Sequence, residues 1–348
     1  MGDSCCDPRS MGALAAAIRA ELPPGTQIIS FDTSFEGRGA ADASRDVWSS
    51  FFGSVPAQVE RACRVLRSHS AIRDSTGGEF DAVGFSQGGL FLRALVQRCG
   101  NGNGNGKEVE ENENGNKTSS SSSSLSSSPS PPFSPRARTL ITLGSPHQGV
   151  TAFPSCQPPV GALVEGGGLE EEGGAPATFP SSQNLTSPSF FCRAAEALIQ
   201  RGAFAPGVRD RVVQAQYFKD PRAFHKYITH NPFLPDINNE KAVRNETYKA
   251  ALSSLDRLVL IRFTEDTVVE PRDSAWFSSF EPGNPPGPLV PMREQAMYTE
   301  DWLGLRALDE SGRLVLAECP GQHMWFTDTW LKENVLDEYL YGPKVVSS

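Results

Sequence analysis

The stretch FDAVGFSQGGLFLRALVQRC, residues 80–99, carries the strongest structural signal in the chain. An apolar run that favours a β-strand leads into Gly84-Phe85-Ser86-Gln87-Gly88, and helix-forming residues follow at once. This is a G-x-S-x-G pattern in the context it requires, with a strand before it and a helix after it. The glycines permit a sharp turn that lifts the Ser86 hydroxyl above the sheet edge. We therefore predict that Ser86 is a nucleophile.

Further apolar runs alternate with helical patterns along the chain. Residues 58–69 place Val59, Ala62 and Leu66 on one helical face, and a terminal helix is expected around residues 325–340. Alternating strands and helices indicate a mainly parallel sheet with helices on both faces. We predict one α/β-hydrolase domain over residues 1–348, with further strands at residues 26–34, 137–145, 257–266 and 312–319.

Two segments interrupt this alternation. Residues 100–136 are rich in Gly and Asn, then acidic, then rich in Ser and Pro, so we predict a disordered low-complexity insertion. Residues 150–252 lie between two predicted strands, where α/β-hydrolases carry a helical lid. Residues 190–200 and 208–218 are predicted to be its amphipathic helices. We expect an apolar groove beneath this lid-like insertion.

A serine nucleophile needs a base and an acid, and α/β-hydrolases order them Ser, acid, His. His323 lies in the loop after the last strand, which is the usual place for the base. Asp266 ends the apolar strand before it and is the predicted acid. Asp273 and Glu265 stay open as alternative acids. His147 also follows a strand and competes for the base, although no strand-end acid separates it from the serine.

Composition excludes several classes of function. The net charge is −9 without a basic stripe, so nucleic acid is not an expected partner. No apolar run reaches the length of a transmembrane segment, and the first twenty residues show no signal peptide. No metal cluster, phosphate loop or dinucleotide fingerprint appears, so no cofactor is expected. Seven cysteines and the sequons at Asn116, Asn184 and Asn245 nevertheless favour a secretory compartment.

The opening MGDSCCDPRSMGALAAAI permits two interpretations. Gly2 with Cys5 and Cys6 suggests an acylated membrane anchor, but the myristoylation pattern requires Ser or Thr where Cys6 stands. The alternative is a Gly-containing catalytic loop that runs into a helix.

The chain resembles the palmitoyl-protein thioesterase 1 family, soluble lysosomal enzymes of the α/β-hydrolase superfamily. The resemblance spans nearly the whole chain and is carried by MGDSCCDPRSMGA, GFSQGGLFLRALVQRC, LGSPHQGV, NPFLPDINNE, NETYKAAL, EDTVVEPRDSAWF, YTEDWLGLRALDESGRLVL and GQHMWFTDTW. It implies hydrolysis of long-chain fatty acyl thioesters on S-palmitoylated proteins or peptides, with Ser86, Asp266 and His323 as the catalytic triad. It supports the catalytic-loop interpretation, with oxyanion-hole amides from the backbone of Met1 and Gln87.

The resemblance also implies disulfides Cys5–Cys6, Cys63–Cys99 and Cys156–Cys192, with Cys319 free. Among the sequons, Asn184 and Asn245 are the candidates for glycosylation. It implies a lysosomal, vacuolar or secreted protein whose true start, with a signal peptide, lies upstream. In the family a strand ending in His-Gly precedes GDSCC, so we expect a missing first strand here. Two alternatives remain, namely a general lipase or carboxylesterase and a catalytically impaired lipid-binding paralogue.

Overall fold

A four-stranded parallel sheet forms the centre of the computed structural model. The structure describes residues 11–31, 33, 43–99, 133–152 and 188–340. Strands β1 (Glu79–Phe85), β2 (Arg136–Leu143), β3 (Arg257–Phe263) and β6 (Leu314–Cys319) lie in the order β1-β2-β3-β6, and every neighbouring pair is parallel. The α/β-hydrolase class predicted from the sequence is confirmed.

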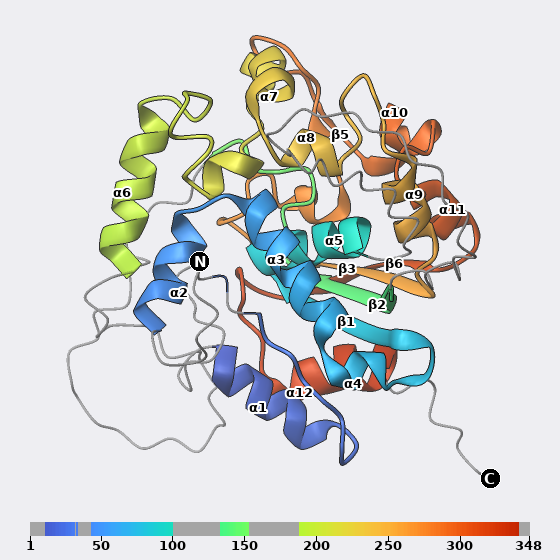
Figure 1. Cartoon of the computed structure of the whole chain (residues 1–348). Coiled ribbons are helices and arrows are strands. Elements are labelled where there is room, and N and C mark those ends of the chain that lie inside the picture. The colour runs from blue at the N-terminus through green and yellow to red at the C-terminus, as the bar shows by residue number, and fades with distance from the viewer. Residues whose placement is uncertain (1–10, 32, 34–42, 100–132, 153–187, 341–348) are drawn as a thin grey trace, which may run out of the picture.

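Helices cover both faces of this sheet (Figure 1). On one face lie α3, α5 and α9, and on the other lie α1, α12 and η6. Leu140, Leu258 and Leu260 point into the core beneath the first group, whereas Ile141 and Val259, one residue along, pack in the core of the second. Successive residues of a strand point to opposite faces of the sheet. Both sets of positions carry apolar side chains because helices cover both faces.

The other described elements connect and flank these layers. The predicted helices at residues 58–69, 190–200 and 325–340 correspond to α3, α6 and the pair α12 and η6. No helix in the described ranges is both long enough and apolar enough to cross a bilayer. The bounds are α1 Met11–Glu21, α2 Ala43–Phe51, α3 Val55–Ser68, α4 Ser70–Arg73, η1 Thr76–Gly78, α5 Gln87–Cys99, α6 Pro188–Gln200, η2 Gln214–Tyr217, η3 Pro221–Ala223, α7 Phe224–His230, α8 Leu234–Ile237, α9 Glu246–Ser253, η4 Arg272–Trp276, β4 Ser279–Phe280, β5 Leu289–Val290, η5 Met292–Glu294, α10 Ala296–Thr299, α11 Leu305–Glu310, α12 Asp328–Leu331 and η6 Lys332–Leu340.

The helix predicted for residues 208–218 is wrong. This stretch forms turns and the short 3-10 helix η2. Its backbone bonds to another segment: Val213 donates to the carbonyl of Phe51 (2.9 Å), and Arg211 accepts from the amide of Gly53 (2.8 Å). These bonds replace the helical ladder that the amphipathic pattern suggested.

The strand predicted at residues 26–34 is also absent from the described part of that stretch. Residues 26–31 run extended, and Ile29 and Phe31 pack against the core that contains α3 and α5. Among the described residues β1 pairs with β2 alone, so these residues add no strand to the sheet. The apolar side chains of Ile29 and Phe31 are partly buried, but a strand also needs a neighbour with which to pair.

Most of the predicted low-complexity insertion lies outside the described residues. Residues 100–132 lie outside the described residues, but Phe133 packs against the core beside α5, and β2 begins at Arg136. The Ser134 hydroxyl donates to the carbonyl of Cys99 at 3.4 Å. The last residues of the predicted range, 133–136, are therefore fixed to the core and to the sheet.

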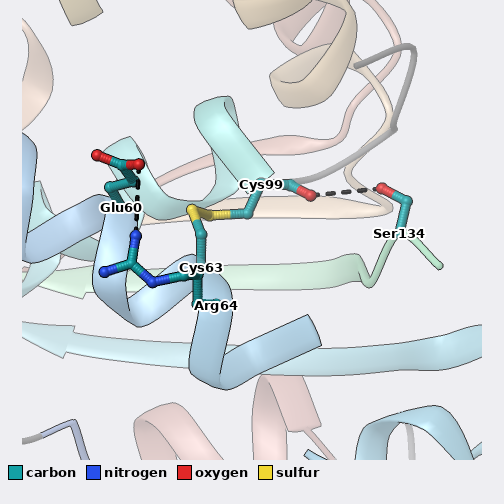
Figure 2. Close-up of a disulfide and its surroundings, with 5 residues drawn as sticks. All are labelled: Glu60, Cys63, Arg64, Cys99 and Ser134. Atoms are coloured by element: carbon teal, nitrogen blue, oxygen red, sulfur yellow. Dashed lines mark hydrogen bonds and ion pairs between the residues drawn. A yellow bond between two sulfur atoms is a disulfide. The ribbon is translucent and has the colours of Figure 1, made fainter. Parts of the chain in front are cut away.

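A disulfide joins the two helices that cover one face of the sheet near β1 (Figure 2). It links Cys63 of α3 to Cys99 at the end of α5, across 36 positions of sequence. Both cysteines are buried among apolar side chains of the same core. The cross-link therefore fixes α3 against the helix that follows Ser86.

Removing this cross-link is expected to destabilise the fold. In the chain-entropy model a loop of this length contributes about 3–4 kcal/mol. We expect the double variant Cys63→Ala/Cys99→Ala to lose that much unfolding free energy in urea titrations. A reductant is the control: it should lower the stability of the unaltered chain by more than that of the double variant, which already lacks this bond. An equal effect of reductant on both proteins would contradict the assignment.

Candidate active site

Ser86 occupies the turn between β1 and α5, as the motif predicts. Its φ is 50°, a strained value for a residue with a side chain. The Ser86 amide donates to the carbonyl of Leu143 in β2 at 2.7 Å, and its own carbonyl accepts from Gly89 at 3.1 Å. The turn is therefore tied to the sheet on one side and to the helix on the other.

Two glycines permit this turn because strand and helix approach closely. A Cβ on Gly84 would lie 2.5 Å from the Cα of Gly89, and one on Gly89 would lie 2.0 Å from the Oγ of Ser145. Gly88 completes the motif, but a Cβ added to it would have no other atom within 4 Å. The contact thus depends on Gly84 and Gly89, the second of which lies just outside the G-x-S-x-G pattern.

Three side chains form a hydrogen-bonded relay. The Nε2 atom of His323 lies 2.9 Å from the Oγ of Ser86, and its Nδ1 lies 2.6 Å from the Oδ2 of Asp266. The other oxygen of Asp266 accepts the amides of Val268 and Val269, each at 2.9 Å. Asp266 is only 5% exposed, so its carboxylate has fixed partners in place of water.

The fold brings these residues together from separate strand ends. Ser86 follows β1, Asp266 follows β3, and His323 follows β6, so all three lie at the carboxyl edge of the parallel sheet. The ring of Phe263 contacts that of His323 edge-on, with centroids 5.7 Å apart. A Cβ on Gly144 would lie 3.0 Å from the His323 ring, so this glycine also leaves room for the imidazole.

A cavity of about 820 Å³ opens at Ser86 and His323. Leu14, Ile18 and Phe91 contribute to its largely apolar lining. Residues 79–85 and residues 25–31 each line it without a break. Because successive strand residues face opposite ways, an unbroken run means that the cavity meets the edge of β1 and not one face of the sheet.

The groove expected beneath residues 150–252 stays a prediction, because this cavity is lined mainly by other parts of the chain. Of the described residues in that range, 150–152 and 188–252, Tyr217 and Phe233 alone line the cavity. Most of the lining comes from α1, from residues 22–31, from β1 and from α5.

Comparison with known proteins identifies the family. The sequence model described as "Palmitoyl protein thioesterase" matches residues 1–111 and 130–323. The chain belongs to the palmitoyl-protein thioesterase family. It is 30% identical to palmitoyl-protein thioesterase 1 of Caenorhabditis elegans over 339 residues, covering 97% of this chain and 89% of the relative.

Other family relatives match less of the chain. Palmitoyl-protein thioesterase 3 of Dictyostelium discoideum is 29% identical over 278 residues, covering 80% of this chain and 69% of that protein. A Drosophila melanogaster protein named as a homolog of the lysosomal thioesterase PPT2 is 32% identical over 127 residues, covering 36% of this chain and 43% of its own. The relatives' names identify this family as hydrolases of thioesters.

The competing acids of this thioesterase-family chain have other partners or face solvent. Asp273 pairs with Arg262, and Glu265 is exposed. His147 is fully buried, and its Nε2 lies 2.9 Å from the hydroxyl of Thr142. The structure therefore brings neither alternative acid, nor His147, to Ser86.

Several predicted features lie outside the described residues. These are Met1, the pair Cys5–Cys6, Cys156 and the sequon at Asn184, while Cys192 has no described side chain. The side chain of Asn245 is exposed and caps α9 by accepting the amide of Thr247 at 3.0 Å. Cys319 is free and buried. The described residues hold no cluster of three or more His, Cys, Asp or Glu side chains suited to a metal.

His147 makes stability depend on pH. Burial, helped by the nearby Arg93 cation, holds the pKa of His147 well below its usual 6.5, and its ring stacks on Phe277 with centroids 4.7 Å apart. The folded chain therefore keeps this imidazole neutral, whereas the unfolded chain binds a proton below pH about 6.5. The contribution of neutral His147 to the free energy of unfolding is fully present above that pH. It decreases as the pH falls below 6.5.

We predict that His147→Phe flattens this dependence. The unaltered chain should lose up to about 1.4 kcal/mol per pH unit below 6.5 through this group, and the variant should not. Urea unfolding at pH 7 and pH 5 measures the difference. An identical pH slope in both proteins would refute the assignment.

Proposed function

We propose that the chain hydrolyses long-chain fatty acyl thioesters on S-acylated cysteines of proteins or peptides. The observation that carries the proposal is the relay from Ser86 through His323 to Asp266, at the mouth of an apolar cavity. Membership of a family of palmitoyl-protein thioesterases supports the same reaction.

The reaction proceeds as two acyl transfers. His323 Nε2 takes the proton of Ser86, whose oxygen attacks the thioester carbonyl, and Asp266 holds the imidazole in the tautomer with its proton on Nδ1. The tetrahedral intermediate collapses, and the cysteine sulfur leaves with the proton from His323. Water, activated by the same histidine, then releases the fatty acid and restores the Ser86 hydroxyl.

Negative charge on the carbonyl oxygen needs preorganised donors. The amide of Gln87, at the N-terminus of the 13-residue helix α5, is one proposed donor, and the backbone of Met1 is the other. The positive end of the helix dipole lies beside the reacting carbon and stabilises the same charge.

The acyl chain is proposed to occupy the cavity at Ser86. Its apolar side chains include Leu14, Ile18, Phe31, Phe91 and Phe233. Its volume lies within the range of small-molecule sites, roughly 300–1,000 Å³. An apolar chain buried there gains hydrophobic stabilisation that a short acyl group does not.

A secretory compartment, lysosomal or secreted, is part of the proposal. The disulfide between Cys63 and Cys99 is stable in an oxidising compartment, and relatives are named lysosomal thioesterases.

The decisive test of the chemistry is Ser86→Ala assayed on a palmitoyl thioester. We expect kcat/KM to fall by at least about 10³-fold because the nucleophile is lost. Ser311→Ala, on an exposed serine after α11, is the matched control and should retain full activity.

The outcomes separate the competing functions. Faster turnover of a matched oxygen ester would favour a general esterase. Binding of the palmitoyl thioester without hydrolysis would favour an impaired lipid-binding protein. Activity retained in Ser86→Ala would reject the proposed nucleophile.

Chain-length preference tests the proposed acyl site. Ala15 of α1 lines the cavity, whereas its exposed neighbour Ala16 does not. We expect Ala15→Phe to narrow the cavity and to lower kcat/KM about tenfold more for a palmitoyl than for a butyryl thioester. Ala16→Phe is the control; an equal loss for both acyl lengths in Ala15→Phe would place the acyl chain elsewhere.

A further inference from the structure

The side chain of Gln87 joins three elements beside the proposed nucleophile. Its Nε2 donates to the carbonyl of Ser50 in α2 at 3.2 Å, and its Oε1 accepts from the hydroxyl of Tyr217 at 3.0 Å. The side-chain Nε2 of Gln214 donates to the same Oε1 at 3.4 Å and to the same Ser50 carbonyl at 3.1 Å. Because a carbonyl only accepts, Ser50 fixes which end of the Gln87 amide faces it, and Oε1 must face Tyr217.

The partners of Gln87 are themselves held firmly. Tyr217 and Gln214 belong to η2 and are 4% and 3% exposed. Gln216 of the same turn donates to the carbonyl of Gly53 at 2.6 Å and accepts the amide of Val55 at 2.8 Å. Burial raises the pKa of Tyr217, so its hydroxyl remains a donor throughout the neutral range.

This anchoring acts on the backbone because Gln87 is the first residue of α5. A side chain held at both ends of its amide restricts rotation of its own peptide unit. That peptide N–H is the oxyanion donor in the proposed function. A donor contributes most when it points at the charge before the reaction begins.

We infer that Tyr217 and Gln214 are positioning residues, which hold the Gln87 side chain so that its backbone N–H points at the reacting carbonyl oxygen. The inference rests on the proposed function. It also changes the role of η2, which belongs to the segment predicted to be a lid. In this arrangement η2 supports the oxyanion hole through Gln87, and Tyr217 also lines the cavity proposed for the acyl chain.

The first test variant is Tyr217→Phe, which removes one hydroxyl and keeps the buried ring. We expect kcat/KM on a palmitoyl thioester to fall about fivefold to tenfold, mainly through kcat, because the donor is displaced and not removed; complete loss of a donor is worth about 10²–10³-fold. Tyr248→Phe is the matched control, because its hydroxyl bonds to Asp236 (3.0 Å) away from the site. It should leave kcat/KM unchanged.

Inhibitor binding separates positioning from a loss of structure. A palmityl trifluoromethyl ketone accepts the Ser86 oxygen at its carbonyl carbon; the serine proton passes to His323, and the ketone oxygen becomes the oxyanion. Its inhibition constant should rise in Tyr217→Phe by the same factor as kcat/KM falls. A palmityl thioether, which forms no oxyanion, should bind both proteins equally.

A double-variant cycle provides an independent measure. Gln87→Met keeps the peptide backbone but removes all the amide contacts, so adding Tyr217→Phe to it should cause no further loss. Additive losses, unchanged kcat/KM in Tyr217→Phe, or equal weakening of the ketone and the thioether would overturn the inference. Absence of thioester hydrolysis by the unaltered chain would instead reject the proposed function.

Discussion

The close contact between β1 and α5 at Gly84 and Gly89 is the constraint on which the site depends. The chain reverses from strand to helix within one residue, and only glycine leaves room for the two backbones to meet. The hydrogen bond from the Ser86 amide to Leu143 ties this turn to the neighbouring strand. The serine hydroxyl is therefore held at the edge of the sheet with its backbone in a strained conformation.

The parallel sheet then places Asp266 and His323. Strands β3 and β6 run in the same direction as β1, so the residues that follow them emerge at the same edge. Asp266 is fixed by the amides of the turn it begins, and it orients His323 toward Ser86. Backbone bonds fix the turns at Ser86 and Asp266, and side-chain hydrogen bonds then join residues 237 positions apart, with His323 2.9 Å from Ser86.

The structure agrees with the sequence where the cause is local. The turn at Ser86 requires glycines a few residues away, and Asp266 and His323 lie after the ends of strands, as the sequence pattern indicates. In the described part of residues 26–34 the expected strand is absent because pairing depends on a distant neighbour. The helix expected at residues 208–218 does not form because its backbone bonds to residues 51–53. The contacts of Gln87 with Ser50 and Tyr217 span 37 and 130 positions of sequence, so no local sequence pattern predicts them.

The most direct test of the central claim is to look for the acyl-enzyme itself. Asp266→Asn should slow release of the fatty acid, and rapid acid quenching after mixing with a palmitoyl thioester should trap the intermediate. Mass spectrometry of the digested protein is then expected to show one palmitoyl group, located on the peptide that contains Ser86. A palmitoyl group on another residue, or hydrolysis with no covalent acyl-enzyme at any mixing time, would contradict the account.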